Sequence, residues 1–150
     1  MTALINARTI GLNAARSAVD TAVAVATSLG VPVCVAVVDR AGHLLAYGRM
    51  DSAPLLSAQI ALDKAYTVAA FGLPTHEWFD LIKDEPALLH GIVKTDRLVV
   101  FGGGVPVTVD GELVGAVGVS GGSTKQDRLI AESGAAAAVP QSVSTSGGVT

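Results

Sequence analysis

Two glycine-rich segments could bring backbone amides close to a small ligand, because glycine has no side chain to hold a partner away. They stand at either end of residues 105–119, where the dipeptide Asp110-Gly111 separates two apolar runs and predicts a tight β-hairpin. Both segments therefore fall at the open end of that hairpin. The candidate ligand-binding residues in them are Gly102, Gly103, Gly104, Ser120, Gly121, Gly122 and Ser123.

Each glycine segment also has a structural interpretation. Residues 102–104 lack the Gly-Lys-Ser/Thr sequence of a phosphate-binding loop and precede a predicted strand, which favours a bulge or tight turn over nucleotide binding. Residues 120–127 enter a predicted helix whose unpaired amides could hold a carboxylate. Capping of that helix by Ser123 or Thr124 would use the same amides, so both interpretations stay open.

Charged residues supply further candidates. Arg49 and Asp51 flank the end of a predicted strand, where a guanidinium could clamp a carboxylate, although a structural Arg–Asp ion pair is the commoner arrangement. Lys64 and Asp127 are candidate acid–base groups. With Arg49 as the clamp and the glycine amides stabilising an oxyanion, they would suit an enzyme that acts on a small organic acid or carbonyl compound.

No metal site is predicted. The three histidines, His43, His76 and His90, are dispersed and lack the spacing of shared metal ligands, so each is expected at the surface or at a cap. Glu77 and Asp80 lie about one helical turn apart, but a solvated acidic face is a stronger interpretation than a surface metal site.

Composition indicates one domain that assembles with copies of itself. The chain has 150 residues, of which 50% are hydrophobic and 15% are charged, and a monomer of this composition would expose much apolar surface. The net charge of -3 and the scattered Lys and Arg residues argue against a nucleic-acid partner. No signal peptide or membrane span is apparent, so we expect a cytoplasmic protein with no membrane partner.

The elements that must position the candidates are predicted from hydrophobic periodicity and from turn residues. They make an α+β fold in which helices pack on a five-stranded antiparallel sheet. We expect one domain over residues 1–140, followed by a flexible tail over residues 141–150. The predicted helices are 4–29, 52–71, 74–82 (capped by Thr75) and 123–138, and the predicted strands are 32–38, 43–50, 93–101, 105–109 and 113–120.

Four blocks of sequence, in order and spacing, resemble the GlcG/HbpS family, which includes the C-terminal domain of PduO-type cobalamin adenosyltransferases. The resemblance implies a profilin-like fold assembled as dimers or octamers, and some members bind or help to degrade haem. In the adenosyltransferase-linked domain the haem ligand is a histidine near the start, whereas the first histidine of this chain is His43. The blocks are VAVVDRAGHLLAYGRMD, ALDKAYTVAAFGLPT, FGGGVPV and GAVGVSGGSTKQD.

These observations lead to three functional hypotheses. The first is a cytosolic, oligomeric small-ligand-binding protein of the GlcG/HbpS type, whose ligand is haem or a small carboxylated metabolite. The second is the enzyme described above, and the third is a structural accessory subunit. The first two place the ligand between residues 102–104, the end of the second strand near Arg49 and Asp51, and the turn at 120–123.

Overall fold

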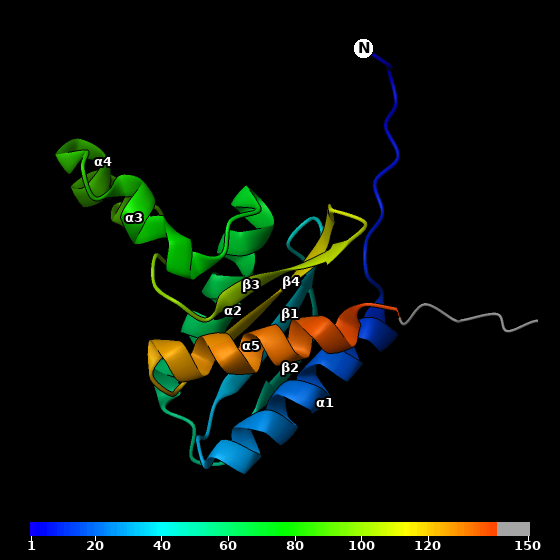
Figure 1. The fold of residues 1–150 in the computed structure, drawn as a ribbon, viewed down its shortest axis with the longest axis vertical. Coiled ribbons are helices and arrows are strands. Elements are labelled where there is room, and N and C mark those ends of the chain that lie inside the picture. The colour runs from blue at the N-terminus through cyan, green and yellow to red at the C-terminus, as the bar shows by residue number, and fades with distance from the viewer. Residues whose placement is uncertain (141–150) are drawn as a thin grey trace, which may run out of the picture.

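The computed structural model describes residues 1–140 and arranges them as one sheet between two layers of helices (Figure 1). All strand pairs are antiparallel, in the order β2-β1-β4-β3. Helices α1 and α5 cover one face and α2 covers the other. The bounds are α1 Leu12–Leu29, β1 Cys34–Asp39, β2 Leu44–Arg49, α2 Leu55–Phe71, α3 Trp78–Ile82, α4 Pro86–Gly91, β3 Gly104–Val109, β4 Glu112–Ser120 and α5 Thr124–Ala138, with single 3-10 turns η1 Thr75–Glu77 and η2 Ile92–Lys94.

Strand β1 is the centre of the core because β-branched and small residues alternate between its two faces. Val35 and Val37 point to the layer of α1 and α5, whereas Cys34, Ala36 and Val38 point to α2. All five are buried. The alternation follows from the two-residue period of a strand, and it lets one strand serve both hydrophobic clusters.

The predicted β-hairpin is confirmed. Asp110 and Gly111 have φ values of 52° and 76° and join β3 to β4, as a two-residue turn of this type requires. Pro106 cannot donate a backbone hydrogen bond, and it lies in β3, which is an edge strand and therefore tolerates it. The hairpin brings residues 102–104 and 120–123 to the same end of the sheet, as expected.

The prediction of five strands is wrong, because residues 93–101 do not form a strand. Ile92–Lys94 is a 3-10 turn, and the turn that follows gives Arg97 a φ of 64°. The backbone here is paired with a side chain instead of a neighbouring strand: Thr67 Oγ1 donates to the Arg97 carbonyl (2.9 Å) and accepts from Val99 N–H (3.0 Å). Local turn formation at Thr95–Leu98 overrides the strand propensity of the valines that flank it.

The first helix begins later than predicted, at Leu12 and not near residue 4. Ile10 N–H donates to the Val114 carbonyl (2.9 Å), and Arg8 Nε donates to Glu112 Oε2 (2.8 Å). These contacts bind the preceding segment to β4 in an extended conformation, which cannot continue a helix. Residues 1–7 extend away from the sheet (Figure 1).

Helices α3 and α4 project from the sheet (Figure 1). Helix α4 has no buried residue, and Leu81 of α3 is 65% exposed. Among the described residues, no helix is long and apolar enough to cross a membrane. The predicted tail, 141–150, lies outside the described residues.

Candidate functional site

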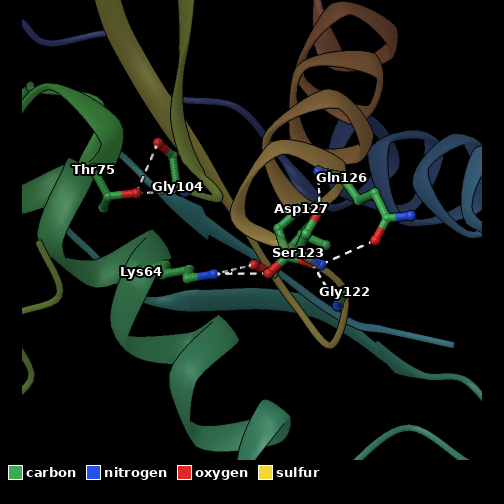
Figure 2. A network of polar contacts seen from close by, with 8 residues as sticks. Lys64, Thr75, Gly104, Gly122, Ser123, Gln126 and Asp127 are labelled. Carbon is green, nitrogen blue, oxygen red and sulfur yellow. Dashed lines mark hydrogen bonds and ion pairs between the residues drawn. The ribbon is translucent and has the colours of Figure 1, made fainter. Parts of the chain in front are cut away.

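A buried ion pair joins two of the residues selected from the sequence. Lys64 of α2 and Asp127 of α5 are 63 positions apart, and Lys64 Nζ lies 3.1 Å from Asp127 Oδ2 (Figure 2). The same ammonium donates to the Val119 carbonyl at 2.8 Å. The exposed fractions of the two side chains are 0% and 4%, so the pair is closed to solvent.

Burial and the ion pair act on the Lys64 ammonium in opposite directions. Loss of solvation disfavours the charged form and lowers the pKa of Lys64, and the nearby Asp127 carboxylate partly opposes this shift. The ring of Phe101 lies 5.1 Å from Nζ and adds a face with partial negative charge. Three contacts, with Asp127, the Val119 carbonyl and the Phe101 ring, therefore stabilise the buried Lys64 ammonium. The ion pair also links α2 to α5 across the end of the sheet.

The turn at 120–123 is held by its own residues. Gly122 N–H donates to Asp127 Oδ1 at 2.8 Å (Figure 2). Ser123 and Gln126 form a reciprocal capping box, in which each side chain accepts from the other's backbone N–H. Of the two interpretations left open by the sequence, capping is confirmed, and it occupies the amides of Gly122 and Ser123 that an anion would need.

The middle glycine of the 102–104 segment has no room for a side chain. A Cβ at Gly103 would lie 2.5 Å from Lys64 Nζ and 2.5 Å from the Val119 carbonyl oxygen, and the φ of this residue is 127°. Only glycine adopts such a backbone conformation without strain. Gly103 thus allows the loop to close over the Lys64–Asp127 pair.

Gly104 is anchored by a residue for which the sequence suggested another role. Thr75 Oγ1 accepts from Gly104 N–H (2.8 Å) and donates to the Gly104 carbonyl (3.4 Å), so it binds the start of β3 (Figure 2). The prediction that Thr75 caps the following helix is wrong: Thr75 is the first residue of the 3-10 turn, the cap positions of the turn and of α3 are Pro74 and Glu77, and neither has a side-chain cap hydrogen bond. A side chain buried beside β3 cannot also reach the amides of α3.

An open cavity of about 250 Å³ lies on the outer side of this network. Its walls come from the 3-10 turn before α3, the loop before β3 and the first turns of α5. Two phenylalanine residues line it, and both are largely exposed to solvent: Phe79 is 57% exposed and Phe101 is 46% exposed. The lining residues are His76, Phe79, Val100, Phe101, Gly102, Thr124, Lys125 and Arg128.

Gly102 shapes this cavity. A Cβ at position 102 would lie 3.4 Å from His76 Cβ and 3.2 Å from the Thr124 carbonyl oxygen. It would therefore occupy the gap between the histidine and the start of α5. Of the seven glycine-segment candidates, Gly102 is the one found among the cavity-lining residues.

The sequence did not single out the remaining cavity residues as a site. His76 was expected to be a surface or capping residue, yet its Nδ1 is buried and has no hydrogen-bond partner among residues 1–140. Phe79 was expected to be an apolar anchor. No spacing rule links Phe79 to Phe101 and Arg128, because they come together only through the packing of α3, the 95–104 loop and α5.

Arg49 and Asp51 lie at the same end of the sheet as the 120–123 turn, but outside the buried network. Arg49 is the last residue of β2, and the register aligns it with Cys34 of β1, which is aligned in turn with Ser120 of β4. Arg49 is therefore two strand spacings, roughly 10 Å, from Ser120. Arg49 Nη2 donates to the Ala53 carbonyl at 3.4 Å, and within residues 1–140 no ion pair joins Arg49 to Asp51. The structure thus brings Lys64, Asp127 and the two glycine segments together. It places Arg49 and Asp51 at the same end of the sheet, without a hydrogen bond or ion pair to those residues within 1–140.

No group of three or more His, Cys, Asp or Glu side chains within residues 1–140 is placed to hold a metal ion. Glu77 and Asp80 are exposed, and Asp80 pairs with Lys83 at 3.2 Å.

Comparison with known proteins gives one consistent family. A family model described as haem degrading protein HbpS-like matches residues 10–136. The uncharacterized 15.0 kDa protein of the dhaT-dhaS intergenic region of Citrobacter freundii is 45% identical over 126 residues, which are 83% of this chain and 88% of that protein. The crystal structure of Klebsiella pneumoniae protein ORFY has a TM-score of 0.86 at 36% identity, covering 92% of this chain and 96% of that chain. The crystal structure of the PduOC:heme complex has a TM-score of 0.79 at 37% identity, covering 86% and 94%.

Proposed function

This chain belongs to the HbpS-like family of haem-degrading proteins, and from that premise we propose that it binds haem in the cavity between α3 and α5. The observation that carries the proposal is the combination of cavity-lining groups: two exposed aromatic rings, two cationic side chains and a histidine without a hydrogen-bond partner at Nδ1. A relative with a similar fold was crystallised as a haem complex.

The lining groups suit the chemistry of haem. Phe79 and Phe101 offer flat apolar surfaces to a macrocycle, and Lys125 and Arg128 can pair with its carboxylates. Arg128 uses Nε for Glu132 (2.7 Å), and its terminal nitrogens remain available as donors in the fork geometry of a guanidinium. When bound, haem supplies a redox-active iron, and the protein supplies its orientation and access.

The size of the cavity sets the binding mode. At about 250 Å³ it is smaller than the roughly 300–1,000 Å³ typical of sites that enclose a drug-sized ligand. We therefore expect one edge of the macrocycle to stay outside this subunit. The same two cations would also hold a small carboxylate, the other ligand considered from the sequence.

Lys64 and Asp127 support this cavity from inside, and we assign them a positioning role. Because Lys64 has no exposed side-chain surface, its ammonium does not face a ligand in the cavity. Its contacts hold Val119, Asp127 and, through Asp127, Gly122 in place. The first two turns of α5, which carry Thr124, Lys125 and Arg128, start from that framework.

Titration with haemin tests the proposal through the Soret band of the porphyrin. We expect a saturable shift of that band for the parent protein and about tenfold weaker binding for Gly102→Ala, because the added methyl group narrows the gap between His76 and Thr124. Gly111→Ala is the control, since a Cβ there meets nothing within 4 Å. A parent protein that leaves the haemin spectrum unchanged would refute haem binding, and saturable binding of a small carboxylate in its place would favour the other ligand.

We also propose that the protein is a homo-oligomer, either a dimer or an octamer. The projecting α3–α4 segment supports this, because it exposes Leu81, and Val93 is also exposed in the turn after it. Burying such side chains between subunits gains about 1.5–3 kcal/mol each.

Light scattering on the eluting protein measures the assembly. We expect a mass that is a multiple of 15.1 kDa for the parent and a smaller species for Leu81→Asp. Leu29→Asp, at the exposed end of α1, is the matched control and should leave the mass unchanged. A parent that elutes as a monomer at micromolar concentration would contradict oligomerisation.

A further inference from the structure

We propose that His76 is the axial ligand of the haem iron, an inference that rests on the proposed haem binding and goes on to name the coordinating residue. The chain has three histidines, and all of them lie within the described residues. His76 is the one that lines the cavity with Phe79, Phe101 and Arg128.

The imidazole of His76 has no partner in the protein. Neither ring nitrogen has a hydrogen bond within residues 1–140, and of the two only Nδ1 is fully closed to solvent. Iron bound at Nε2 would leave the ring proton on this buried Nδ1, so the inference rests on Nε2, the ring nitrogen that keeps contact with solvent at the cavity. An open Nε2 on a cavity wall is in the position from which imidazole most often binds iron.

The other two histidines are differently placed. His43 Nδ1 lies 3.3 Å from Asp39 Oδ2 in the turn between β1 and β2, so its ring is held by a carboxylate. His90 is exposed in the last turn of α4. Neither is among the residues that line the cavity described above.

Packing of nearby residues fixes the backbone at His76. His76 lies inside the 3-10 turn between Thr75, which is bonded to Gly104, and Trp78, whose ring is buried against Phe71 with ring centres 4.9 Å apart. Both neighbours are 3% exposed or less. These contacts anchor the backbone around His76, and its Cβ lies beside the Gly102 loop, 3.4 Å from the position that a Cβ at Gly102 would take.

The test combines two probes, haemin and iron-free protoporphyrin IX. For haemin, we expect His76→Ala to lose the Soret position of the parent complex and to bind about 10- to 100-fold more weakly, whereas His43→Ala and His90→Ala should match the parent. We expect the parent and His76→Ala to bind protoporphyrin IX with equal affinity, because this porphyrin has no iron for His76 to bind. This pair of probes separates ligation from packing against the porphyrin.

A second variant, His76→Gly, tests iron ligation even if the His76→Ala protein misfolds. In His76→Gly, added imidazole should restore the parent Soret position, because the free ring can occupy the space of the lost side chain. Haemin binding by His76→Ala with the parent spectrum and affinity would overturn the assignment and leave haem binding intact. A parent protein that binds protoporphyrin IX and haemin equally well, with no change on His76→Ala, would likewise overturn iron ligation while keeping the cavity.

Discussion

Gly103→Val should prevent the protein from folding, at a cost of more than about 4 kcal/mol. The new side chain would begin 2.5 Å from both the Lys64 ammonium and the Val119 carbonyl oxygen, neither of which can withdraw without breaking the buried pair or the sheet. The φ of 127° adds backbone strain of about 1–3 kcal/mol for any residue with a Cβ. Chemical denaturation followed by circular dichroism measures the loss.

The control for this prediction separates strain from collision. Gly111→Ala also places a Cβ on a residue with positive φ (76°), but in open space, so it should cost no more than the strain. If Gly103→Val instead keeps the folded structure and only loses the ligand, then Gly103 lines the ligand site and the loop is more pliable than its contacts indicate.

Lys64→Ala should lower the free energy of unfolding by about 3–5 kcal/mol, because it leaves the Asp127 carboxylate buried without its cation. The double variant Lys64→Met, Asp127→Leu removes both charges and should recover much of that loss. The exposed pair Lys83–Asp80, with its charged atoms 3.2 Å apart, is the matched control, and Lys83→Ala should cost less than about 1 kcal/mol. Equal effects of Lys64→Ala and Lys83→Ala would show that burial does not strengthen the pair.

The same pair has a signature in pH dependence. Because burial lowers the pKa of Lys64 in the folded state below its ordinary value of 10.5, there is a range of pH in which the unfolded chain holds a proton that the folded protein has released. Stability contributed by this group therefore rises with pH across that range and is constant below it. Lys64→Met removes the group, so its unfolding free energy should lack this rise in alkaline solution.

Much of the fold could be predicted from local sequence. Asp110-Gly111 predicted the hairpin, and the Val-rich run at residues 33–38 predicted a buried strand, because both signals are set by the chain within a few residues. The strand expected at 93–101 failed for the opposite reason. The backbone of this segment is hydrogen-bonded to the side chain of Thr67, about 30 positions away, and a local sequence pattern cannot predict such a bond. The profilin-like description of the fold stays a prediction.

The candidate site was predicted only in part. Lys64 and Asp127 were named separately, and the structure joins them, although as a closed pair below the cavity surface. The residues that line the cavity come from three distant segments, and what unites them is exposure of apolar and cationic side chains around one hollow. Exposure depends on tertiary packing. The sequence therefore drew attention to His76 and Phe79 individually, but it could not show that they line one cavity with Arg128.

The strand order β2-β1-β4-β3 also bears on how the chain folds during synthesis. β1, the most buried strand, receives one neighbour from its own hairpin, but its other neighbour is β4, at residues Glu112–Ser120. A ribosome must therefore release nearly the whole domain before β1 is covered on both sides. During that interval the valines of β1 form an open, apolar strand edge, which is the kind of surface that chaperones bind and that aggregates when left unprotected.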